Sequence, residues 1–75
     1  MILPDKNIDL RHSLLGFGSL ILPELKTMQT VSSLWEKMRE EGKIRSYEKF
    51  VLTLDFLFAI QLIEYESGLI KLKTK

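Results

Sequence analysis

An apolar run from Phe50 to Ile63 limits the folds open to this chain more than any other feature. At a helical repeat of about 100° per residue, its apolar side chains point to nearly every side. Such a helix must be covered on all sides, whereas a surface helix needs only one apolar stripe. A chain of 75 residues buries only about 60% of the surface that its unfolded form exposes. We therefore expect another protein surface to supply part of the cover.

The composition is that of an ordinary small globular domain. Hydrophobic residues make up 45% and charged residues 28% of the sequence, which argues against general disorder. The net charge of +1 gives no strong attraction to nucleic acid or to an anionic membrane. The absence of cysteine excludes disulfides and thiolate metal sites. Residues 1–6 lack the pattern of a signal peptide, and the apolar run is too short to span a bilayer. We expect a cytoplasmic protein without membrane contact.

Residues 1–12 are predicted to form an extended N-terminal arm, followed by a single domain over residues 13–75. Pro4 and the turn-forming residues that follow it argue against a helix. Ile2 and Leu3 give the arm apolar side chains, which pack either on its own domain or on a partner.

Capping signals predict three helices. Ser13 is expected to cap a first helix that Pro23 ends or kinks. Gly16 and Gly18 inside it each cost roughly 1 kcal/mol relative to alanine, so we expect close packing against another helix. Thr30 or Ser32 caps a second helix that ends before Gly42. Ser46 caps a third helix over residues 47–61.

Apolar and charged residues alternate after the third helix. Two such segments, residues 63–66 and 70–73, flank Ser67-Gly68, which predicts a β-hairpin with a two-residue turn. Three helices followed by a two-stranded wing are typical of a winged helix-turn-helix, a mainly α fold with a small β-hairpin.

The third helix is the one that reads bases in DNA-binding proteins of this fold, and it then needs an exposed polar or basic face. A helical wheel assigns one face to the core: Tyr47, Phe50, Val51, Leu54, Leu57 and Phe58. The opposite face is also apolar, with Leu52, Phe56, Ile60 and Ile63, and is flanked by the acids Glu48 and Asp55. Exposed apolar stripes mark protein-binding sites, so we predict a partner-binding surface on Ile2, Leu3, Leu52, Phe56, Ile60 and Ile63. Alternatively, the arm or the first helix of the same chain covers this stripe.

Basic residues support a different function, that of a small DNA-binding transcriptional regulator. Its phosphate contacts would come from Lys43, Arg45, Lys49, Lys71 and Lys73. A solvated surface explains these residues better, because lysines on an edge strand discourage aggregation and the net charge is near zero.

Catalytic chemistry is not indicated. His12 is the only histidine, and no cysteine accompanies it as a nucleophile or metal ligand. Gly16-Phe17-Gly18 lies within a helical pattern and lacks the Gly-Lys-Ser/Thr of a phosphate-binding loop. We expect no enzyme activity, no metal and no cofactor.

Four segments carry a resemblance to a known family. Residues 1–6, 13–16, 30–36 and 50–57 resemble, in order, the small middle components of bacterial ABC-three-component systems. The resemblance implies a winged-helix accessory subunit encoded with an SMC/Rad50-like ATPase and an effector that is often a nuclease, as in Lamassu-type defence against phages and plasmids. It implies no catalytic residues. A homodimer through the apolar stripe is compatible with either function.

Overall fold

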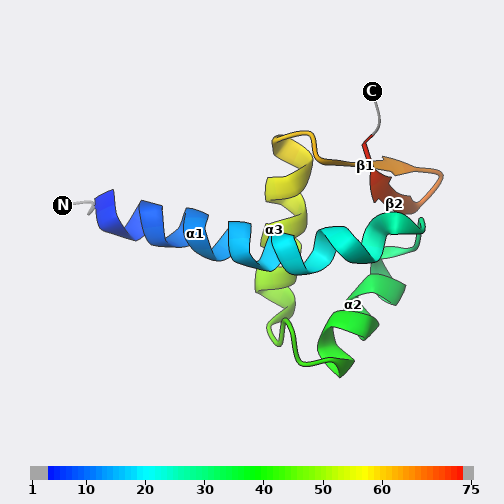
Figure 1. Cartoon of the computed structure of the whole chain (residues 1–75), viewed down its shortest axis with the longest axis horizontal. Coiled ribbons are helices and arrows are strands. Elements are labelled where there is room, and N and C mark those ends of the chain that lie inside the picture. The colour runs from blue at the N-terminus through cyan, green and yellow to red at the C-terminus, as the bar shows by residue number, and fades with distance from the viewer. Residues whose placement is uncertain (1–3, 74–75) are drawn as a thin grey trace.

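The computed structural model describes residues 4–73 of the chain and the side chains of residues 12–73. Its elements are α1 (Pro4–Ile21), the 3-10 helix η1 (Leu22–Lys26), α2 (Val31–Glu40), α3 (Tyr47–Ala59), β1 (Ile63–Glu66) and β2 (Leu69–Leu72). Figure 1 shows α1 crossing α3, with α2 beneath the crossing and the hairpin beside η1. Three helices followed by a two-stranded antiparallel hairpin confirm the predicted fold class.

The N-terminal arm is helical, which corrects the expectation of an extended segment. α1 begins at Pro4, so the predicted boundary between residues 12 and 13 falls inside it, and Ser13 is an interior residue rather than its cap. Proline is favourable at the first helical position, because the first N–H groups of a helix have no partner within it. The N-terminal half of α1 extends beyond the other elements (Figure 1).

The other end of α1 follows the prediction for Pro23. The α-helix ends at Ile21 and continues as η1, which contains Pro23. Gly18 lies where α1 crosses α3, and a Cβ atom there would be 2.9 Å from Cδ2 of Leu57. The predicted close packing is therefore confirmed at Gly18 but wrong at Gly16, where a Cβ atom would meet nothing within 4 Å.

The ends of α2 and α3 show the expected capping. The Thr30 hydroxyl accepts a hydrogen bond from the Ser33 amide, and the Ser46 hydroxyl accepts one from the Lys49 amide. α2 ends at Glu40, and Gly42 follows its C-cap with a φ of 68°, the left-handed conformation that glycine favours. α3 ends two residues earlier than predicted, because Gln61 adopts the same conformation with a φ of 66°.

The predicted hairpin is confirmed, and in it Tyr65 lies opposite Ile70 and Ile63 opposite Leu72. Ser67 and Gly68 both have positive φ, as a type I′ turn requires. The loop before α2 also pairs with the hairpin: the Gln29 amide donates to the Ile70 carbonyl, and the Ile70 amide donates to the Gln29 carbonyl. This bridge ties the start of α2 to β2.

The core lies where the helices and the hairpin meet. Among residues 12–73 it contains ten buried apolar side chains: Ile21, Leu25, Leu34, Met38, Ile44, Phe50, Leu54, Leu57, Ile63 and Ile70. All six elements contribute to this core or to the residues packed against it. Within residues 4–73, no helix is long and apolar enough to cross a membrane.

Candidate protein-binding surface

The outer side of α3 carries one stripe of four exposed residues. Glu48, Leu52, Asp55 and Ala59 recur at the spacing of a single helix face, and all four are exposed. Leu52 keeps 43% of its surface exposed between the two acids. This is the side of the third helix that a winged-helix DNA reader turns to the major groove, and it bears no cation here.

The predicted partner-binding residues are only partly brought together. Leu52 and Ile60 are exposed, and Phe56 is half-buried against the core. Ile63 was wrongly placed on this surface: it is 1% exposed, because it begins β1 and faces inward. Ile2 and Leu3 lie outside the described residues.

The buried face of α3 is rotated relative to the helical-wheel prediction. Tyr47 and Phe58, which were assigned to the core, are exposed, whereas Thr53 is buried. Thr53 can be buried because its hydroxyl donates a hydrogen bond of 2.7 Å to the Lys49 carbonyl and is not left unpaired. Its spacing of three and four residues from Phe50 and Leu57 was a usable signal for this face.

The rotation creates an aromatic pair that sequence reasoning missed. Phe58, 50% exposed, packs against Tyr65 of β1, 45% exposed, with ring centroids 5.3 Å apart. Both residues line a groove between the end of α3 and the hairpin. Partial burial raises the pKa of the Tyr65 hydroxyl, and the negative charge of Asp55 raises it further. Asp55 and Phe58 are three residues apart on α3 and are therefore neighbours on its surface, so the stripe and the aromatic pair form one surface.

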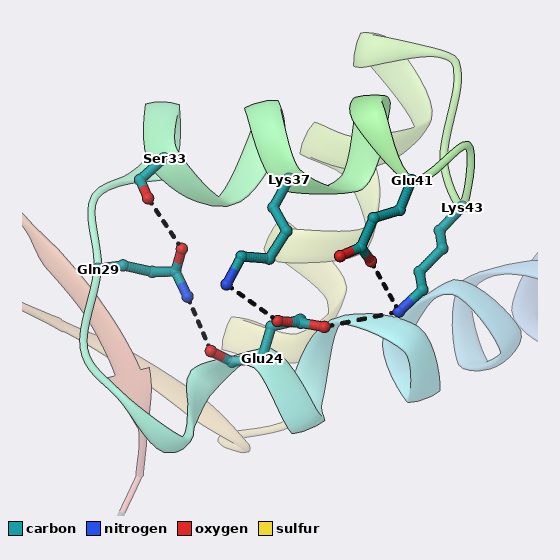
Figure 2. A network of polar contacts seen from close by, with 6 residues as sticks. All are labelled: Glu24, Gln29, Ser33, Lys37, Glu41 and Lys43. Carbon is teal, nitrogen blue, oxygen red and sulfur yellow. Dashed lines mark hydrogen bonds and ion pairs between the residues drawn. The ribbon is translucent and has the colours of Figure 1, made fainter.

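On the opposite side of the domain, two basic residues, Lys37 and Lys43, form ion pairs with Glu24 of η1 (Figure 2). Glu24 accepts ion pairs from Lys37 at 3.2 Å and from Lys43 at 3.5 Å, and Lys43 also lies 2.9 Å from Glu41. The hydrogen bond from Lys37 is the main reason that the pKa of Glu24 lies below its usual value. The hydrogen bond to Glu41 is the main reason that the pKa of Lys43 is raised.

The backbone carbonyl of Glu24 is hydrogen-bonded as well. The Gln29 side chain donates to the Glu24 carbonyl at 2.7 Å and accepts from the Ser33 hydroxyl at 3.1 Å (Figure 2). This polar network fastens η1 to α2. It depends on residues far apart in the sequence, and no local pattern pointed to it.

The cations predicted to contact phosphate are mostly engaged within the chain. Lys71 pairs with Glu66 and, at 3.5 Å, with Glu64. Its pairing with Glu66 raises the pKa of Lys71 and lowers that of Glu66. The Lys49 ammonium lies 6.0 Å from the ring centre of Phe17, and Lys73 donates to the Gln61 side chain. Arg45 is exposed and makes no ion pair with another described residue.

The described residues hold no cluster of three side chains suited to a metal ion. His12 is exposed on α1.

Comparison with known families matches nearly the whole chain. The family model for the ABC-three component (ABC-3C) system Middle Component 6 covers residues 3–73. Comparison with curated proteins and with solved structures gave no match. The family match confirms the resemblance to middle components that the four sequence segments suggested.

Proposed function

This chain belongs to the ABC-three component (ABC-3C) system Middle Component 6 family, and from that premise we propose that it is a non-catalytic assembly subunit. In this proposal it binds an SMC/Rad50-like ABC ATPase and an effector, often a nuclease, in a bacterial complex that acts in the cytoplasm against phages or plasmids. A middle component of a three-component system has protein partners, and this chain needs a surface for them.

One observation carries the proposal: the side of α3 opposite the core exposes Leu52 between two acids. An exposed apolar side chain is individually unremarkable, but the exposed Phe58 and Tyr65 continue this surface from α3 onto the hairpin. Aromatic residues are enriched among those that contribute most to protein–protein binding.

The test is co-purification with the ATPase and effector subunits encoded beside this chain. Leu52→Glu introduces a charge at an exposed position, so the variant should fold while losing the complex. Phe56→Glu is less informative, because Phe56 packs against the core and its loss also destabilises the domain. Met28→Glu is the matched control, since Met28 is 49% exposed on the loop before α2.

The expected result is that wild type and Met28→Glu recover the partners and Leu52→Glu does not. Recovery of the partners by folded Leu52→Glu would refute this surface. Failure of the wild type to recover either subunit would refute the function itself.

The alternative function is a small DNA-binding regulator, favoured by the winged-helix layout and the lysines of the hairpin. The acids Glu48 and Asp55 on the outer side of α3 would repel phosphate, and Lys43 and Lys71 already pair with carboxylates. Fluorescence anisotropy with duplex DNA at low salt distinguishes the two functions. Tight, salt-sensitive duplex binding by the isolated chain would favour the regulator.

A further inference from the structure

The acidic–apolar face, defined here as Glu48, Leu52, Asp55, Phe58 and Tyr65, joins the exposed stripe of α3 to the aromatic pair. Leu52, Phe58 and Tyr65 supply its apolar surface, and each is between 43% and 50% exposed. Glu48 and Asp55 are also exposed. A segment lying along α3 would meet apolar side chains and both carboxylates at once.

The two carboxylates of this face have no cation beside them in the described part of the chain. Neither Glu48 nor Asp55 makes an ion pair there, whereas Glu24, Glu36, Glu41, Glu64 and Glu66 all do. Lys49, the one cation of α3, is directed toward the Phe17 ring on α1 instead. A partner that covers this face must therefore bring positive charge of its own, since burying unpaired carboxylates is costly.

The spacing of the carboxylates indicates the form of that partner. Glu48 and Asp55 are seven residues apart, which is about 10.5 Å along a helix axis. A second helix packed along α3 repeats its contact positions with the same seven-residue period. Lys and Arg also have long aliphatic stems that can cover an apolar neighbour such as Leu52 while their charged ends reach the acids.

We propose that the acidic–apolar face binds an amphipathic helix of a partner subunit that carries two Lys or Arg residues one heptad apart, with apolar residues between them. This inference rests on the proposed function and specifies the chemistry of the partner. A second copy of this chain fits the face poorly. In a two-fold antiparallel contact centred beside Leu52, Glu48 of one copy would lie opposite Asp55 of the other, and like charges would meet twice.

The experiment measures binding of the full chain to the purified ATPase subunit and, separately, to the purified effector subunit. The variants are Glu48→Lys and Asp55→Lys, and Glu40→Lys is the matched control because Glu40 is an exposed acid of α2. Each reversal should weaken binding by roughly 5- to 30-fold, since an attraction is lost and a repulsion gained. Glu40→Lys should bind as the wild type does.

Neutral variants and the salt dependence of binding separate a loss of charge contacts from a loss of folding. Glu48 lies in the first turn of α3, where a cation disfavours the helix, so Glu48→Gln and Asp55→Asn repeat the comparison with less effect on folding. Affinity of the wild type should fall as salt rises, and the neutral variants should show a shallower dependence.

The outcomes separate this inference from the proposed function. If the wild type binds neither subunit, both fail. If the wild type binds but the variants at Glu48 and Asp55 bind as tightly as Glu40→Lys, only the inference fails. Dimerisation of the isolated chain that Leu52→Glu abolishes would also overturn it, because a second copy would then occupy the face.

Discussion

The two glycines of α1 form a matched pair that tests how closely α1 packs on α3. Both lie inside one helix, and replacement of a helical glycine by alanine stabilises a helix by about 0.5–1 kcal/mol when nothing opposes it. At Gly16 a new Cβ atom meets nothing within 4 Å. Gly16→Ala should therefore stabilise the protein by about that amount.

Gly18→Ala gains the same helix propensity but meets the side chain of Leu57. The new Cβ atom would lie 2.9 Å from Cδ2, 3.6 Å from Cγ and 3.7 Å from Cδ1 of that residue. Leu57 is 1% exposed and surrounded by core side chains, so it has little room to move. Inserting a methyl group into a packed core typically costs about 1–3 kcal/mol. Gly18→Ala should therefore be less stable than Gly16→Ala by about 1–3 kcal/mol.

Urea unfolding followed by circular dichroism measures both variants against the wild type. The helix-propensity gain cancels in the difference, which leaves the packing cost. In thermal unfolding, 1 kcal/mol corresponds to about 4–8 °C for a domain of this size. A double-mutant cycle with Leu57→Ala should recover most of the cost, because the clash is then removed. If Gly18→Ala proves as stabilising as Gly16→Ala, the close crossing of α1 and α3 is wrong.

Two further predictions concern the polar network and the end of α3. The lowered pKa of Glu24 means that its pairing stabilises the fold above the usual pKa of 4.5, and that this contribution is lost as the pH falls through the lowered value. When the pH falls below 4.5, the free energy of unfolding of Glu24→Gln should therefore decrease less than that of the wild type. Urea unfolding at several pH values measures both decreases. Equal decreases in the two proteins would contradict this reasoning. Gln61→Gly should stabilise the protein by roughly 1 kcal/mol, because Gln61 has a φ of 66° that glycine adopts without strain. A thermal melt of this variant with an unchanged or lower midpoint would contradict that reasoning.

Local signals predicted the elements that local interactions determine. Thr30, Ser46 and Gly42 mark helix ends through their own hydrogen bonds and backbone conformation, and Ser67-Gly68 does the same for the hairpin. These features depend on a few neighbouring residues, so one sequence was sufficient to place them.

Features that depend on the third dimension were predicted less well. Pro4 argues against a helix anywhere but at its first position, and the sequence alone did not show that α1 begins there. Which face of α3 is buried depends on packing between elements, such as that of Gly18 on Leu57, so the burial of Thr53 and the exposure of Phe58 were not predicted. The Glu24 network joins η1, α2 and the turn before α3, so it could not be read from any one segment.

The central claim is that this chain is an assembly subunit, and measuring the mass of the complex that contains the chain tests it most directly. The chain alone has a mass of 8.8 kDa. Co-expressed with the ATPase and effector encoded beside it, it should elute in size-exclusion chromatography with light scattering as part of a stable complex whose mass includes all three subunits. Elution of the chain only as a free particle, beside an ATPase–effector complex formed without it, would contradict the account.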